Sequence, residues 1–126
     1  MYKSFLLFTI SFLIAVLAKA QLNYIDFSNV KPQDKTLKYC WNALGKDSSN
    51  NIYAVFGVNW TNETENGCIF RYKADSEKTE MLGNFIDILK DHDNYVSGES
   101  VPKGHSELRY LNGRMYFGTQ PFHDIN

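Results

Sequence analysis

Alternation of apolar and polar positions predicts short β-strands along most of the chain after residue 36. Strands of four to eight residues, rich in β-branched and aromatic side chains and bounded by glycine or polar turns, are typical of antiparallel sheets. Four such runs follow one another: 39–44, 52–56, 68–73 and 79–82. We therefore predict an all-β protein in which residues 37–83 form a four-stranded antiparallel meander.

The strongest local signal is Asn112-Gly113, because both residues of a two-residue hairpin turn must accept positive φ. Counting outward from this turn predicts the pairs Leu111–Arg114, Tyr110–Met115, Arg109–Tyr116, Leu108–Phe117, Glu107–Gly118, Ser106–Thr119 and His105–Gln120. Alternation then predicts two faces of the hairpin. The core face carries Leu108, Tyr110, Met115 and Phe117, and the opposite face carries Glu107, Arg109, Leu111 and Tyr116.

The segments on either side of these elements are less regular. Residues 21–36 read as a lead-in strand and a loop, and we treat residues 84–103 as an insertion or connecting loop. Residues 84–103 include a short apolar run made of Phe85, Ile86, Ile88 and Leu89. The run is too short for its periodicity to distinguish a helical turn from a strand.

The stretch NIYAVFG (51–57) resembles GRMYFGT (113–119), and each follows a leucine and a polar turn. The strings IYAVFG, GCIFRYKADSEK, TEMLG and NGRMYFGT together resemble the blades of secreted β-propeller repeat proteins over residues 37–119. The resemblance implies one blade at 37–83 and the start of a second at 104–126. Because propellers have about four to eight blades, the chain would be the N-terminal part of a longer protein. A small complete secreted β-domain is the competing interpretation.

The first twenty residues differ in composition from the rest. Lys3 precedes an apolar run from Phe5 to Leu17, which closes on the small-x-small pattern Ala18-Lys19-Ala20. The run is shorter than the roughly 20 residues that span a bilayer, so we favour a signal peptide over a membrane anchor. We predict cleavage after residue 20, no membrane span afterwards, and a secreted or periplasmic protein.

Charge excludes one class of partner. The predicted mature chain keeps 11 of the 13 basic residues, since Lys3 and Lys19 are removed, against 14 acidic residues. No basic cluster is present, so we do not expect nucleic-acid binding. Nothing in the sequence indicates the oligomeric state.

Two cysteines and two sequons bear on the compartment. Cys40 and Cys68 form either one disulfide, as an oxidising compartment permits, or two apolar thiols. Their spacing does not fit a structural zinc site. Asn59 and Asn62 begin N-glycosylation sequons, which matter only in a eukaryotic secretory pathway.

The candidate chemistry lies at the open end of the hairpin. Register places His105 there and His123 within roughly 10 Å of it. The propeller resemblance implies that this end opens on a ligand-binding face together with Trp60, Lys103 and Asp124. Two imidazoles can serve as general base and acid, whereas His92 reads as a solvated loop residue.

Some propellers are polysaccharide lyases, so the resemblance implies a catalytic His105–His123 pair with Tyr116 and Arg109 in reserve. A non-catalytic surface that binds a small molecule or a polysaccharide, with Trp60 stacking on a sugar ring, is our first functional hypothesis, and the lyase is the alternative. The third is the small β-domain with one disulfide. No cofactor is predicted, although His105, His123 and Asp124 have the chemistry of divalent-metal ligands.

Overall fold

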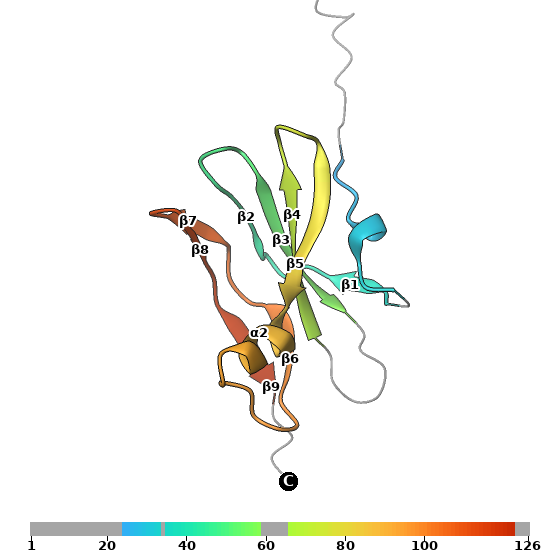
Figure 1. Ribbon diagram of the computed structural model, residues 1–126, viewed down its shortest axis with the longest axis vertical. Helices are drawn as coiled ribbons and strands as arrows, with labels where there is room; N and C mark the ends of the chain where they lie inside the picture. Colours follow the sequence, from blue (N-terminus) through green and yellow to red (C-terminus); the bar gives the residue numbers. More distant parts are fainter. Residues whose placement is uncertain (1–23, 34, 59–65, 123–126) are drawn as a thin grey trace, which may run out of the picture.

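The computed structural model describes residues 24–33, 35–58 and 66–122 (Figure 1). The predicted signal peptide at 1–20 lies outside these residues. The described elements are η1 (Ser28–Val30), β1 (Leu37–Tyr39), β2 (Leu44–Lys46), β3 (Ile52–Val58), β4 (Asn66–Lys73), β5 (Lys78–Asn84), α2 (Phe85–Asp91), β6 (Ser100–Gly104), β7 (Arg109–Leu111), β8 (Arg114–Tyr116) and β9 (Thr119–Phe122). Strands therefore dominate the described chain, as the sequence predicts.

Strands β2, β3, β4 and β5 form the predicted antiparallel meander. They belong to a seven-stranded mixed sheet whose main path is β1-β3-β4-β6-β9, while β7 and β8 form a separate two-stranded sheet. The predicted first strand at 39–44 is wrong in one respect. Asn42 has a φ of 56°, which extended backbone cannot include, so the run is divided between β1 and β2.

Residues 84–103 contain a helix and a strand. Asn84 caps α2, since its side-chain oxygen accepts the Asp87 backbone N–H at 2.9 Å. Asn66 is almost fully buried and donates to the same oxygen at 2.7 Å. β6 then pairs antiparallel with β9 and makes a single parallel bridge to β4. The apolar run that the sequence leaves open between helix and strand is therefore helical.

The sheet carries an apolar core on each face. The first core cluster comprises Ala43, Tyr53, Val55, Phe85, Val101 and Leu108. The second core cluster comprises Phe27, Ala54, Val58, Cys68 and Phe70. Successive residues of β3 alternate between the two clusters, as the pleat of a strand requires. The N-terminal segment covers the second cluster, where Phe27 packs tilted against Phe56 and Phe70.

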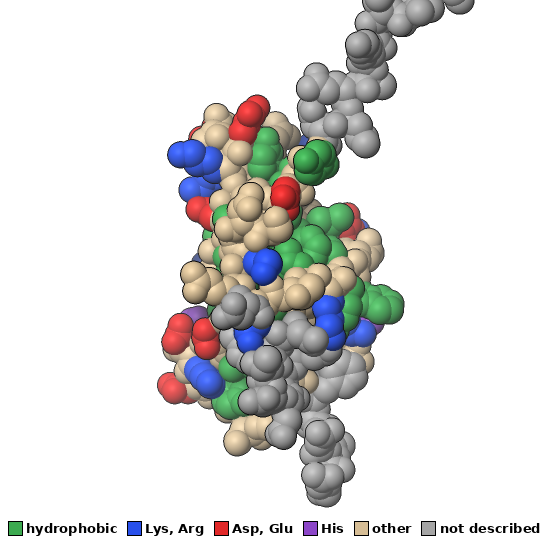
Figure 2. Space-filling view, turned by 90° about the vertical axis from the view of Figure 1, so that its right-hand side faces the viewer, with side chains coloured by type: hydrophobic (Ala, Val, Ile, Leu, Met, Phe, Trp, Pro, Cys, Tyr) green, Lys and Arg blue, Asp and Glu red, His purple; other side chains and the backbone are tan. Residues whose placement is uncertain are grey.

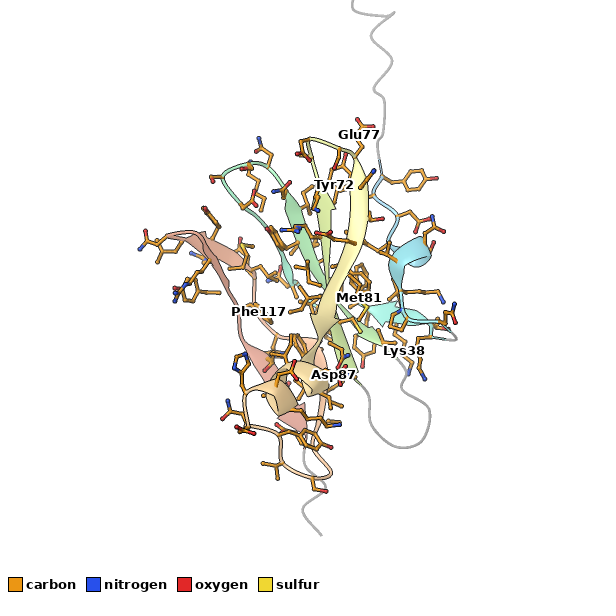
Figure 3. The ribbon with its side chains drawn as sticks, viewed as in Figure 1. Lys38, Tyr72, Glu77, Met81, Asp87 and Phe117 are labelled. Atoms are coloured by element: carbon orange, nitrogen blue, oxygen red, sulfur yellow. The ribbon has the colours of Figure 1, made fainter. Side chains whose placement is uncertain are left out.

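Further apolar side chains surround the second core cluster and are only partly buried, among them Met81 of β5 and Val30 of η1. Figure 2 views the molecule from the side of η1 and β1, and apolar side chains gather near the centre of that face. Figure 3 shows Met81 on the part of β5 that faces this side.

The β7–β8 hairpin has the predicted register at its tip, with Arg109 opposite Tyr116 and Tyr110 opposite Met115. Leu108 is 3% exposed, and Met115 and Phe117 pack on the first core cluster, so they occupy the predicted core face. Tyr110 does not, because it is 38% exposed.

The outer pairs predicted for the hairpin are wrong. Thr119 lies opposite Gly104 and Gln120 opposite Lys103, so His105 does not face Gln120. The reason is that residues 106–108 leave the ladder: the Leu108 backbone N–H donates to the Leu44 carbonyl at 3.1 Å. Such a bulge shifts the pairing beyond it.

Candidate functional site

The site is assembled where residues 41–43 meet residues 103–105. Gly104 permits this contact, since a Cβ at that position would lie 2.8 Å from the Ala43 Cβ and 3.2 Å from the Val55 Cβ. The His105 backbone N–H then donates to the Gly118 carbonyl at 2.8 Å. These contacts position the His105 side chain beside both the β1–β2 connection and the hairpin.

An open surface cavity of about 620 Å³ lies at this junction. It is lined by Asn42, His105, Ser106, Glu107, Arg109, Tyr116 and Phe117. The structure therefore brings together three of the residues that the sequence singles out: His105, Arg109 and Tyr116. All three are solvent-exposed, so the cavity is accessible and hydrated.

Two of the lining residues, Glu107 and Tyr116, are neighbours of Arg109. It lies opposite Tyr116 in the hairpin ladder, and its Nη2 lies 2.9 Å from Glu107 Oε2. The Arg109 side chain is 79% exposed, and an ion pair in water contributes little to stability. Glu107 thus orients a guanidinium that keeps most of its hydrogen-bonding capacity for a ligand.

An aromatic residue that the sequence does not single out directly precedes one of the lining residues in the chain. Trp41 precedes Asn42, is 55% exposed, and has the Lys103 ammonium 4.7 Å from its ring centroid. The Tyr39 ring packs edge-on against it at 6.1 Å. The available signal is Asn42, since asparagine tolerates positive φ and a change in direction at this position separates Trp41 from the strand that follows.

Phe117 separates this polar cavity from an apolar cleft beside α2 (Figure 3). The cleft has a volume of about 290 Å³ and is lined by Ile69, Phe85, Ile88, Leu89, Val101, Phe117 and Thr119. The Phe85 and Phe117 rings lie 5.7 Å apart. The same side chain thus anchors the hairpin in the core and forms one wall of the candidate site.

Several predicted residues lie outside the described part of the chain: Asn59, Trp60, Asn62, His123 and Asp124. The convergence of His105 with His123 therefore stays a prediction, as does a metal site with Asp124. Within residues 24–33, 35–58 and 66–122, no three His, Cys, Asp or Glu side chains are grouped as metal ligands. His92 is exposed at the C-terminal end of α2. No helix among the described residues is long and apolar enough to cross a bilayer.

The sequence leaves open a disulfide or two thiols, and both cysteines are thiols in the structure. Cys40 packs against the first core cluster and Cys68 belongs to the second, on the other face of the sheet. Burial, with a smaller contribution from the negative charge of Asp87, raises the pKa of the Cys68 thiol to about 12. Cys68 is therefore a neutral apolar residue at physiological pH.

Comparison with known proteins yields no relative: no family model, curated protein or solved structure matches the chain. The propeller resemblance over residues 37–119 therefore stays a prediction. Function has to be inferred from the geometry and chemistry of the cavity itself.

Proposed function

We propose that the chain is the N-terminal part of an extracytoplasmic β-propeller that binds an anionic polysaccharide through the cavity beside His105. The propeller is supported by the way the hairpin packs. Leu108, Met115 and Phe117 lie against the same face of the meander that carries Tyr53 and Val55. Packing of the start of one blade on the face of the preceding one is the arrangement that a propeller repeats around its axis.

Polysaccharide binding is supported by one observation above all: His105, Arg109 and Tyr116 line a single open cavity. A guanidinium binds carboxylate or sulfate groups through two parallel hydrogen bonds. Tyr116 adds an aromatic face and a hydroxyl group, and Asn42 and Ser106 add further polar groups. Glu107 is the one carboxylate among the described lining residues, and it is paired with Arg109.

Exposure of the cavity favours binding over catalysis. A general base gains most from a site that excludes water, where its proton affinity can be tuned by burial. His105 is exposed instead. The second candidate function, a polysaccharide lyase, is favoured by the same grouping of residues. His105 would remove the C5 proton next to a uronate carboxylate that Arg109 neutralises. The electron pair would form the C4–C5 double bond as the C4–O glycosidic bond breaks, and the departing oxygen would take a proton from solvent.

Titration of the full chain with polygalacturonate tests the proposal. We expect Arg109→Gln and His105→Ala each to weaken binding by roughly fivefold to tenfold, as loss of one hydrogen bond to the ligand does. Arg114→Gln is the matched control, because Arg114 is an exposed arginine of the same hairpin that does not line the cavity. Equal losses in all three variants, or no binding by the wild type, would contradict the proposal.

The lyase function requires a separate experiment, which measures product formation. Wild-type protein should release unsaturated uronate products, measured by ultraviolet absorbance, and His105→Ala should abolish that release. Binding without product formation would exclude the lyase and leave the binding proposal intact.

Further I-Y-x-x-x-G strands encoded after Asn126 would support the propeller, and a stop codon there would favour the small β-domain.

A further inference from the structure

We propose that Trp41 forms a second sugar-binding subsite beside the cavity, so that the ligand is a chain of linked sugars and not a single sugar. This inference rests on the proposed polysaccharide-binding function. It adds a residue and a ligand class that the cavity alone does not specify. The observations that carry it are the fixed orientation of the indole, its exposure and its place next to a lining residue.

The Trp41 side chain is held in place by its neighbours. Lys103 lies over the ring at 4.7 Å from the centroid, and the Tyr39 ring makes a T-shaped contact with it. Tyr39 is itself fixed above Gly57, where a Cβ would lie 2.5 Å from the tyrosine ring. A ring that is already oriented loses little conformational entropy when a ligand stacks on it.

Trp41 is nevertheless 55% exposed. The face of an indole carries partial negative charge, and the C–H groups of a pyranose ring carry partial positive charge. A sugar ring can therefore stack on the part of the indole that Tyr39 and Lys103 leave open. Lys103 also adds a positive charge next to this position, which suits an anionic sugar.

The place of Trp41 determines the length of the ligand. Asn42 lines the cavity and Trp41 is the residue before it, so their Cα atoms lie about 3.8 Å apart. A single sugar occupies the cavity, where Arg109 pairs with its carboxylate, whereas a linked chain reaches the indole as well. Because the second contact is then intramolecular, a chain binds more tightly than its units do separately.

Galacturonic acid and its dimer and hexamer, titrated calorimetrically into the full chain, test the inference. We expect the hexamer to bind at least tenfold more tightly than the single sugar. Trp41→Ala should weaken hexamer binding by roughly tenfold and leave single-sugar binding unchanged. Trp41→Phe should retain most of the affinity, since it keeps an aromatic face. Tyr24→Ala is the matched control, because Tyr24 is an exposed aromatic residue on the N-terminal segment.

A second measurement does not depend on the folding of the alanine variant. In Trp60→Phe, Trp41 is the one remaining tryptophan, and the hexamer should change its fluorescence while the single sugar does not. Hexamer binding with neither a fluorescence change nor an effect of Trp41→Ala would overturn this inference alone. Absence of any binding to polygalacturonate would overturn the proposed function as well.

Discussion

The ammonium group of Lys103 lies 4.7 Å from the centre of the Trp41 indole. This contact joins the C-terminal end of β6 to the connection between β1 and β2. The two segments are far apart in the sequence. Trp41 precedes Asn42 in the chain and Lys103 lies two residues before His105, and both Asn42 and His105 line the cavity with Arg109 and Tyr116. The candidate site is thus a junction between the first meander and the hairpin, and its integrity depends on how closely the two pack.

Gly104 is the position at which that packing is most sensitive. A Cβ added there would meet the Ala43 Cβ at 2.8 Å, and neither side chain can move out of the way. We expect Gly104→Ala to lower the free energy of unfolding by about 1–3 kcal/mol, the usual cost of overpacking a core, and to weaken polygalacturonate binding. Urea denaturation measures the first effect.

The control for this substitution is Gly83→Ala. A Cβ at Gly83 would meet Ile88 Cδ1 at 3.5 Å, which is ordinary van der Waals contact. Its unfolding midpoint should stay near that of the wild type. Equal destabilisation by both alanines would show that the close approach at Gly104 is not the cause.

Asp47 organises the turn between β2 and β3. Its carboxylate accepts hydrogen bonds from the Ser49 and Asn51 backbone N–H groups, the Asn51 amide and the Tyr53 hydroxyl, at 2.9–3.0 Å. Partial desolvation alone would raise the pKa of Asp47, but the hydrogen bonds outweigh it and lower the pKa below its ordinary value. The ionised form is therefore the one that stabilises the turn.

A folded-state pKa below the unfolded value means that this stabilisation is complete above about pH 4 and is lost as pH falls through the folded value. We expect Asp47→Asn to lower the free energy of unfolding by about 2 kcal/mol at pH 7. The difference from wild type should shrink in acid. A difference that stays constant from pH 7 to pH 2.5 in urea titrations would contradict this account.

The two thiols should differ in reactivity. The raised pKa and burial of Cys68 leave almost no thiolate to react, whereas Cys40 is only partly buried. Iodoacetamide should therefore label Cys40 first in the folded protein and both cysteines after denaturation without reductant, as measured by mass spectrometry. No labelling until reductant is added would reveal a disulfide and favour the small β-domain.

Asn84 joins three elements through its side chain. Its oxygen accepts from Asn66 of β4 and from the Asp87 backbone N–H of α2. Asn84→Ala removes the helix cap and leaves the buried Asn66 amide without this partner, so we expect a loss of about 2–4 kcal/mol in thermal or urea unfolding. Asn94→Ala, at an exposed position, is the control and should change stability by less than about 0.5 kcal/mol.

Local pattern predicts the strands whose neighbours are close in sequence. β3 and β4 alternate between two faces and carry their own turn signals, and Asn112-Gly113 sets the register of the hairpin tip. The pattern fails where a distant contact competes with the ladder. Residues 106–108 leave the hairpin because the Leu108 backbone N–H pairs with Leu44, and nothing near Leu108 in the sequence indicates that partner.

The residues of the candidate site also divide into those that the sequence indicates and those that only the structure reveals. His105, Arg109 and Tyr116 are recognisable from their places on a predicted hairpin, and the structure brings them into one cavity. Trp41 is not recognisable, because alternation assigns it to a strand. The positive φ of Asn42 ends the extended run after Trp41, and Lys103 covers part of the indole ring.

The sequence by itself determines that this chain is mostly β, where its meander and hairpin lie, and which side chains of the hairpin tip face the core. Those features depend on period-two alternation and on turn residues, which act over a few positions. The tertiary structure alone decides the split of the first strand, the helix at Phe85–Asp91 and the pairing of β6 with β9. It also decides that Trp41 and Lys103 join the site, because these outcomes depend on packing between segments far apart in the chain.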